Sequence, residues 1–217
     1  MTRTKPLIIF DLDGTLLDTQ ASLADAFNRA LEEMNAPAKA VEAFRYIIGD
    51  GARIAASRCL PEERQSDDEI DRCLAGFKHH YDNTWRDAQP YPGIETLIAS
   101  LRSKAHLAVL SNKDDVFTQK CISNYFEGDF DMVLGYRPEF GLKPNPAGGQ
   151  HIMDTLSVAA NNTMLVGDMA IDMKTAVACN ISGVGVLWGF RDEPELTSAG
   201  ASHVIKEPSE LIKLVSL

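Results

Sequence analysis

The stretch LIIFDLDGTLLDT, residues 7–19, places two aspartates, Asp11 and Asp13, at the end of an apolar run. Such a run is typical of a strand covered on both faces, and Gly14 allows a tight turn directly after it. Alternate side chains of a strand share one face, so we expect both acids to project the same way. Parallel α/β sheets bind ligands at the carboxyl ends of their strands. Taken alone, the stretch also fits an ordinary Asp-Gly turn.

Composition limits what these acids can belong to. The chain has 217 residues, a net charge of -10 and 45% hydrophobic residues, which is ordinary for a globular enzyme. The negative charge disfavours nucleic acid as a partner. The longest apolar runs are too short for a membrane span or a signal peptide, so we expect no membrane association and a cytoplasmic location.

Cysteine and histidine residues show no metal-site or disulfide pattern. The four cysteines are far apart in the sequence, and His79 and His80 are adjacent without an HExxH motif. We therefore expect reduced, mostly buried thiols and histidines with surface or structural roles.

Further buried runs predict a parallel sheet. They lie at residues 6–10, 106–111, 131–135, 163–168 and 184–188, with a weaker run at 203–205. Helical stretches separate them, which is the pattern of βα units. The fold class is therefore α/β.

The long interval after the first strand carries only helical patterns. Apolar residues mark two helix faces there, namely Leu23, Phe27, Ala30, Leu31 and Met34 on one, and Ile70, Leu74, Phe77 and Tyr81 on the other. Ser66 and Glu69 predict a capping box at the start of the second helix. Residues 18–85 are thus expected to form an inserted helical subdomain, and Pro92-Gly93 opens the helix that leads back to the sheet.

Polar residues follow several of the predicted strands. Asp168 comes directly after one, with Asp172 four residues on, and Ser111 and Asn112 end another. Lys143 lies in a segment stiffened by prolines. Clustered carboxylates repel one another unless a cation joins them, and an all-oxygen site favours Mg²⁺ over zinc. Because Mg²⁺ commonly also takes a phosphate oxygen, the constellation predicts phosphoryl chemistry.

Four motifs, DLDGTLLDT, LSNK, KPNP and VGDMAID, resemble in order and spacing those of the haloacid dehalogenase superfamily of phosphatases. The resemblance covers essentially the whole chain. It implies a Rossmann-like core, residues 1–17 and 86–217, and a mobile helical cap, residues 18–85.

The resemblance also implies residue roles. Asp11 would be the nucleophile that becomes phosphoaspartate, Asp13 the general acid and base, and Lys143 a group that offsets charge. Substrate phosphate would lie near Gly14, Ser111 and Asn112. Mg²⁺ would be held by Asp11, the main-chain carbonyl of Asp13, and Asp168, with Asp172 a further ligand directly or through water. Thr15 and Asp18 would shape the loop.

The sequence departs from the family pattern at three positions. Met169 stands where the family usually has Ser or Thr, so a hydroxyl is missing beside Asp168. Gly148 and Gly149 fall early in the helix expected after KPNP, where each costs up to about 1 kcal/mol relative to Ala.

Substrate choice is expected to depend on the cap. The segment IIGDGARI, residues 47–54, resembles the cap loop of phosphoglycolate phosphatases. Gly49 and Gly51 would let the backbone approach a small ligand, and Arg53 would meet a substrate carboxylate. Alternatively, the glycines merely end one helix and Asp50 starts the next. The substrate hypothesis is 2-phosphoglycolate or another small phosphorylated acid.

Three alternatives to this function stay open at this point. A hexose-phosphate mutase of the same superfamily would share the core residues named above. A haloacid dehalogenase would use Asp11 but would need neither the metal nor an acid at position 13. A non-catalytic binding or regulatory module with this fold is the third, because fold alone does not establish function. The expected assembly is a monomer or a homodimer.

Overall fold

The structure, a computed structural model, describes residues 5–215 and is built on one six-stranded parallel sheet. The strand order is β5-β4-β1-β6-β7-β8, with bounds β1 Leu7–Phe10, β4 His106–Asp114, β5 Met132–Tyr136, β6 Thr163–Gly167, β7 Ser182–Val186 and β8 His203–Ile205. Phe10 lies opposite Val109 on β4 and Val166 on β6. The predicted α/β sheet is confirmed, and β1 lies between the two strands that carry most of the other site residues.

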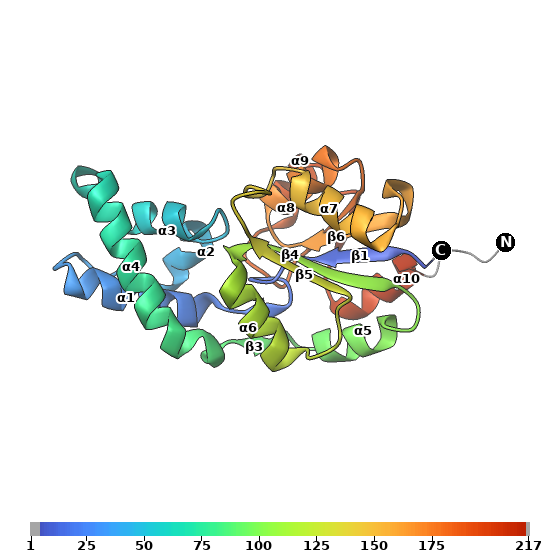
Figure 1. Cartoon of the computed structure of the whole chain (residues 1–217), viewed down its shortest axis with the longest axis horizontal. Coiled ribbons are helices and arrows are strands. Elements are labelled where there is room, and N and C mark those ends of the chain that lie inside the picture. Colours follow the sequence, from blue (N-terminus) through green and yellow to red (C-terminus); the bar gives the residue numbers. More distant parts are fainter. Residues whose placement is uncertain (1–4, 216–217) are drawn as a thin grey trace.

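Helices cover both faces of the sheet because the residues of β1 alternate between two apolar clusters (Figure 1). Leu7 and Ile9 pack with α7 and α8, whereas Ile8 and Phe10 join the cluster on the other face. The helices of this part are α5 Ile94–Leu101, α6 Asp115–Tyr125, α7 Ala147–Leu156, α8 Ala170–Ala178, α9 Glu193–Ser198 and α10 Leu211–Val215. Side chains pointing in either direction from β1 are therefore buried, as its continuous apolar pattern predicts.

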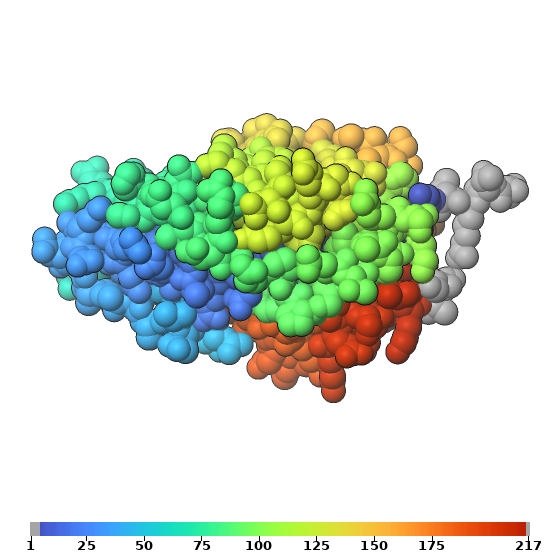
Figure 2. All heavy atoms as spheres, turned by 90° about the horizontal axis from the view of Figure 1, so that it is seen from below, coloured from blue at the N-terminus to red at the C-terminus, as the bar shows by residue number. Residues whose placement is uncertain are grey.

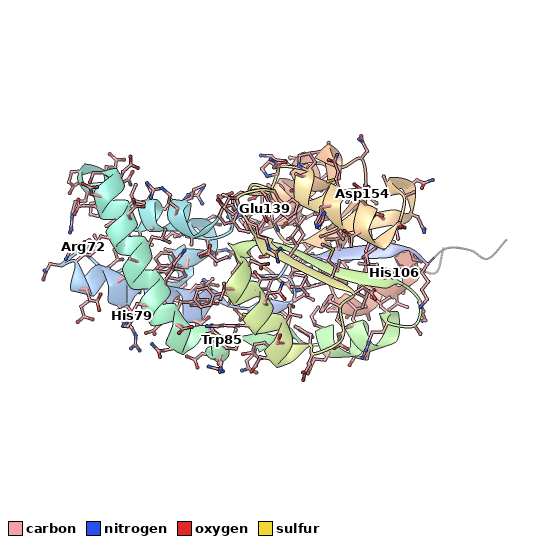
Figure 3. All side chains as sticks on the ribbon, viewed as in Figure 1. Arg72, His79, Trp85, His106, Glu139 and Asp154 are labelled. Carbon is pink, nitrogen blue, oxygen red and sulfur yellow. The ribbon has the colours of Figure 1, made fainter. Side chains whose placement is uncertain are left out.

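A helical bundle forms the other end of the molecule (Figures 1 and 2). It contains α1 Gln20–Glu33, α2 Phe44–Ile47, α3 Ala52–Cys59 and α4 Asp67–Thr84, with short 3₁₀ turns at Val41–Ala43, Glu62–Arg64 and Trp85–Asp87. The two predicted apolar faces meet between α1 and α4, where the rings of Phe27 and Phe77 stack with centroids 3.9 Å apart. Polar residues of α4 such as Arg72 and His79 point outward (Figure 3).

The chain enters and leaves this bundle through a two-stranded antiparallel ribbon. Its strands are β2 Leu17–Asp18 and β3 Gln89–Pro90, and Leu17 lies opposite Pro90. The helical insertion is thus tied to the sheet through two short segments that lie side by side. The domain bounds at residues 18 and 85 stay a prediction.

Local details differ from expectation at two points. The strand predicted at residues 184–188 is β7, Ser182–Val186, because its pairing with β6 begins at Ser182 opposite Met164. The hydroxyl of Ser66 accepts the N–H of Glu69 at 3.4 Å, but the Glu69 carboxylate pairs with Arg64 at 2.6 Å instead of completing the capping box.

The cysteines are free and buried, as predicted, and burial raises the pKa of the Cys59 thiol to about 12. Within residues 5–215, none of the helices has the length and apolar character needed to cross a bilayer.

Candidate active site

The predicted site residues converge at the carboxyl ends of three neighbouring strands. Asp11 follows β1, Ser111 and Asn112 lie near the end of β4, and Asp168 follows β6. Because β4 and β6 both pair with β1 in parallel, the segments that follow these strands meet at the carboxyl end of the sheet. Their clustering follows from the strand order and not from their separation in the sequence.

Three buried carboxylates form the centre of the site. One oxygen each from Asp11, Asp168 and Asp172 lies within 4.8 Å of the others. Lys143 places its Nζ 2.8 Å from Oδ1 of Asp11 and 2.6 Å from Oδ1 of Asp172. Asn112 in turn accepts the Lys143 N–H at 2.7 Å, which fixes the segment that carries the lysine.

The electrostatics of this cluster call for a further cation. Burial raises the pKa of Asp11 to about 7 against the attraction of Lys143, and burial together with the neighbouring acids raises the pKa of Asp168 well above its usual value. Burial alone would lower the pKa of Lys143, but Asp11 and Asp172 outweigh it and the pKa is raised. One ammonium cannot balance three ionised carboxylates. The donor set is all oxygen, which fits a hard divalent cation such as Mg²⁺.

The second aspartate of the opening motif has a separate partner. Lys113 Nζ lies 2.8 Å and 2.9 Å from the two carboxylate oxygens of Asp13. Burial opposes the charge of Lys113, but Asp13 raises its pKa. Sequence reasoning missed Lys113, although it lies in the LSNK motif, because a pairing across a hundred residues leaves no local signal. Asp11 and Asp13 therefore line one cavity with different electrostatic partners.

The loop after β1 is shaped around Asp168. Gly14 has a φ of +86°, and a Cβ there would overlap the Asp168 carboxylate. Thr15 donates its hydroxyl to Oδ1 of Asp168 at 3.1 Å, and the Phe190 N–H donates to Oδ2 at 2.8 Å. Thr15 thus has the loop-shaping role expected of it, whereas Asp18 is exposed and accepts only the N–H of Gln20, at 3.4 Å.

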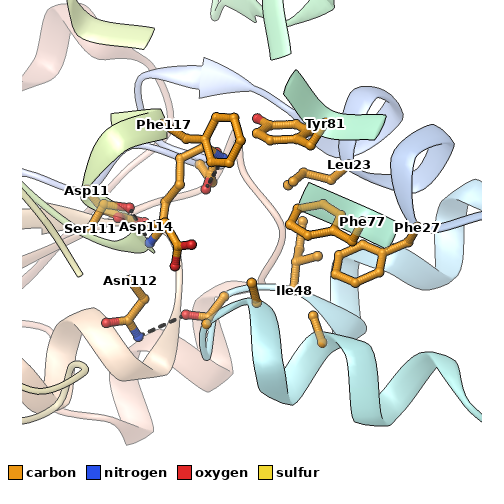
Figure 4. Close-up of a pocket in the computed structure, with 16 residues that line it drawn as sticks. Asp11, Leu23, Phe27, Ile48, Phe77, Tyr81, Ser111, Asn112, Asp114 and Phe117 are labelled. Atoms are coloured by element: carbon orange, nitrogen blue, oxygen red, sulfur yellow. Dashed lines mark hydrogen bonds and ion pairs between the residues drawn. The ribbon is translucent and has the colours of Figure 1, made fainter. Parts of the chain in front are cut away.

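A cavity with about 50 Å³ of space for water-sized molecules joins this polar floor to the helical bundle (Figure 4). Its polar side, the floor, is lined by Asp11, Asp13, Ser111, Asn112, Lys113 and Asp114. We call the opposite side the apolar wall, and it comprises Leu23, Phe27, Ile48, Ala55, Phe77, Tyr81 and Phe117. Sequence reasoning placed several of these residues on buried helix faces without connecting them to the site.

The glycine loop borders the same cavity. Gly49 and Gly51 have φ values of +111° and +96°, and Gly51 precedes α3, so the loop both separates two helices and lines the cavity. Asp50 does not start α3 but pairs with Arg58 at 2.6 Å. The expectation that the glycines separate two helices is thus met together with their place at the cavity, whereas the expectation that Asp50 starts α3 is wrong because Gly51 precedes its first residue.

Two residues predicted to contact the substrate have other side-chain partners in this structure. Arg53 does not line the cavity; its guanidinium pairs with Asp67 and Asp71 of α4, and 45% of its side chain is exposed. Its position on α3 turns it toward the acidic start of α4 and away from the floor. The Asn112 amide donates to the carbonyls of Gly49, at 3.0 Å, and Lys143, at 3.4 Å. The Asn112 side chain therefore joins two loops while the residue lines the cavity, and its contact with a phosphoryl group stays a prediction.

The departures from the family pattern have packing explanations. Met169 is buried against Gly49, where a Cβ would overlap its sulfur, so the methionine contacts the glycine loop of the bundle. Gly148 and Gly149 do lie in α7, and a Cβ at these positions would come 2.8 Å from Leu110 and 2.7 Å from Cys179. Both glycines allow α7 to approach the sheet and α8 closely.

Comparison with known proteins agrees with this fold and site. A model of the haloacid dehalogenase-like hydrolase family matches residues 8–186, so the chain belongs to that family and is an enzyme of its phosphatase type. A phosphoglycolate phosphatase of Mesorhizobium japonicum is 33% identical over 197 residues, covering 87% of this chain and 86% of the relative. Another from Colwellia psychrerythraea is 28% identical over 216 residues, covering 96% of each chain.

Solved structures show the same architecture. A protein of Lactobacillus delbrueckii subsp. bulgaricus, described as a proposed phosphoglycolate phosphatase, superposes with a TM-score of 0.92 at 30% identity. The match covers 98% of this chain and 99% of that one. A haloacid dehalogenase-like hydrolase of Streptococcus pneumoniae has a TM-score of 0.88 at 24% identity over 97% and 98% of the two chains, and this likeness concerns the fold alone.

Proposed function

We propose that this chain is a Mg²⁺-dependent phosphatase that hydrolyses a small phosphate monoester through a phosphoaspartate on Asp11. The observation that carries the proposal is the separate pairing of the two acids, with Asp11 beside Lys143 and Asp13 beside Lys113. One carboxylate can then attack while the other exchanges a proton, which is the division of labour that the two steps need.

In the first step, Oδ of Asp11 forms a bond to phosphorus as the ester P–O bond breaks. Asp13 gives its proton to the departing oxygen, so the alcohol leaves neutral. In the second step, Asp13 takes a proton from water, whose oxygen attacks phosphorus and releases Asp11 and inorganic phosphate. Ser111 lines the cavity and accepts only a backbone N–H, so its own proton is available to a phosphoryl oxygen.

Mg²⁺ would be held by Asp11, Asp168 and Asp172, with the Asp13 carbonyl as the further ligand implied by the family, and when bound it would supply positive charge next to the phosphoryl oxygens. Lys143 adds a second positive charge on the same side and orients Asp11. Thr15 and the Phe190 N–H hold Asp168 by both oxygens, as ligand-orienting groups do at metal sites.

The substrate that we propose is 2-phosphoglycolate or another small phosphorylated acid. The names of the relatives support it, and so does the cavity, because Gly51 and Ala52 at the amino end of α3 line it. The positive end of a helix suits a carboxylate, which would replace the contact first expected from Arg53. A hexose-phosphate mutase is disfavoured because the apolar wall offers few partners to sugar hydroxyls.

The expected cellular location and oligomeric state are part of the same proposal. We propose a cytoplasmic enzyme that acts as a monomer or a homodimer on a small phosphorylated metabolite.

The test is a panel of phosphorylated metabolites assayed for phosphate release with and without Mg²⁺. We expect 2-phosphoglycolate to be preferred and p-nitrophenyl phosphate to be cleaved as a generic ester. Asp11→Asn keeps the shape of the side chain but removes its charge, and should lower kcat by about a thousandfold or more.

Equal activity of the wild type and the Asp11→Asn variant would rule out the covalent mechanism. A clear preference for nucleotides or hexose phosphates would overturn the substrate. Conversion of a sugar phosphate to its isomer without phosphate release would establish the mutase instead.

A further inference from the structure

Two buried side-chain oxygens within the described residues lack a hydrogen-bond partner, Thr19 Oγ1 and Tyr81 Oη. Leaving such a group unpaired costs about 1–3 kcal/mol. Of the two, only Tyr81 lines the cavity above Asp11. An unpaired polar group in a catalytic cavity points to a partner that arrives with the substrate.

The ring of Tyr81 is held in place on α4. It is fully buried, with ring centroids 5.2 Å from Phe77 and 4.9 Å from Phe117. Figure 4 shows its hydroxyl directed toward Phe117, on the side of the cavity where Asp11 and Ser111 lie. Packing on both sides prevents the ring from turning its hydroxyl out to solvent.

The nearest charged group cannot accept the proton of this hydroxyl. Lys113 Nζ lies 4.7 Å from the centroid of the Tyr81 ring, and an ammonium group only donates hydrogen bonds. Lys113 can therefore interact with the Tyr81 oxygen but leaves its proton without an acceptor, and no acceptor within the described residues lies at hydrogen-bond distance. Burial also raises the pKa of Tyr81, so the hydroxyl keeps its proton at neutral pH.

We propose that the Tyr81 hydroxyl donates a hydrogen bond to an oxygen on the organic part of the substrate and is a specificity-determining residue. The substrate class is then a small phosphate monoester that carries one acceptor oxygen close to the ester, as a carboxylate or a hydroxyl does. This inference rests on the proposed phosphatase function and refines it. An analogue without the oxygen leaves the buried hydroxyl unpaired, and sites of this kind discriminate strongly against such analogues.

Leu23, Phe27 and the remaining apolar wall residues limit the number of such oxygens. A substrate with several hydroxyls would bury most of them against carbon, which costs free energy for each unpaired group. Apart from the polar residues that line the floor, Asp114 among them, the organic part of a substrate therefore meets one hydroxyl, that of Tyr81, among apolar side chains.

The variant Tyr81→Phe removes only the hydroxyl and keeps the ring packing. Three esters of similar size serve as probes: 2-phosphoglycolate, 2-hydroxyethyl phosphate and ethyl phosphate, of which the last lacks the acceptor. We expect kcat/KM for at least one oxygen-bearing ester to fall by roughly tenfold to a hundredfold. The value for ethyl phosphate should change by less than about twofold. The ester that loses more identifies carboxylate or hydroxyl as the acceptor.

Tyr125→Phe is the matched control, because its hydroxyl donates outside the cavity and lies 2.7 Å from the Arg86 carbonyl and 2.6 Å from that of Ala88. It should lower thermal stability and leave the ratio between the three esters unchanged. Substrate-free Tyr81→Phe should be at least as stable as the wild type, since it loses an unpaired buried hydroxyl.

The possible outcomes distinguish failure of the inference about Tyr81 from failure of the proposed phosphatase function. Release of phosphate from none of the esters by the wild type would refute both. A wild type that is active while Tyr81→Phe affects all three esters equally, or none, would overturn the role of Tyr81 alone. A wild-type preference for ethyl phosphate over both oxygen-bearing esters would overturn it as well.

Discussion

The floor and the apolar wall of the cavity are built on opposite principles. On the floor, Asp11, Asp13 and Lys143 are charged groups paired with residues far away in the sequence. The wall consists largely of apolar side chains from the bundle, and its buried Tyr81 hydroxyl has no partner. The charged groups of the floor thus have partners within the protein, whereas the Tyr81 hydroxyl of the wall does not.

This difference indicates that the reaction and the selection of the substrate depend on different regions. In the mechanism that we propose, charge pairing on the floor positions a nucleophile and a proton donor for any phosphate monoester. In the same proposal, the wall determines which organic group fits, so the chemistry and the choice of substrate depend on different regions of the molecule.

Apart from loss of the Asp11 nucleophile, the largest effect is expected from a change in the floor. Lys113→Met leaves Asp13 without its partner, so the acid loses the orientation needed for proton transfer, and kcat should fall by about a hundredfold. The measurement is steady-state phosphate release, with circular dichroism to confirm folding. Lys120→Met, which removes an exposed lysine paired with Asp82, should stay within about twofold. If both variants behave alike, the pairing of Asp13 has no catalytic importance.

A second effect should appear in stability as pH changes. The folded pKa of Asp11 is raised from 3.8 to about 7, so the metal-free folded state retains a proton that the unfolded chain has released. The associated stability is present at low pH and is lost as pH rises through about 7. Mg²⁺ requires the ionised ligand and should therefore raise the melting temperature by several degrees more at pH 8 than at pH 6.

Differential scanning fluorimetry at both pH values, with and without Mg²⁺, measures this difference. Asp172→Asn should reduce the Mg²⁺-dependent rise, since it removes one of the three carboxylates. An equal rise at both pH values would show that the floor does not bind the ion through these acids.

The smallest effect is expected at a wall-side residue that faces away from the cavity. Arg53→Gln removes exposed ion pairs with Asp67 and Asp71, so KM for 2-phosphoglycolate should change by less than about twofold. The comparison is made by steady-state kinetics alongside Arg29→Gln, which removes another exposed pair. A selective rise in KM for Arg53→Gln would restore its originally expected contact with the substrate carboxylate.

The elements and the motif positions could be predicted from the sequence because each depends on neighbouring residues. The apolar run before Asp11 specifies a buried strand, the spacing of Phe77 and Tyr81 specifies a helix face, and the acid after each strand is placed by the sheet. Even the error at β7 is a shift of two residues in an element whose type was correct.

The partners of individual side chains could be identified only from the tertiary structure. The packing of elements far apart in the sequence places Lys113 beside Asp13 and Arg53 beside α4. It also places the Asn112 amide between two loops and brings α7 close to Leu110 at Gly148. The sequence alone therefore determined the sheet, the helical insertion and the acids of the floor. Tertiary packing decided which charges are paired and which buried hydroxyl, that of Tyr81, lacks a partner within the described residues, because these depend on distances between segments that no local pattern encodes.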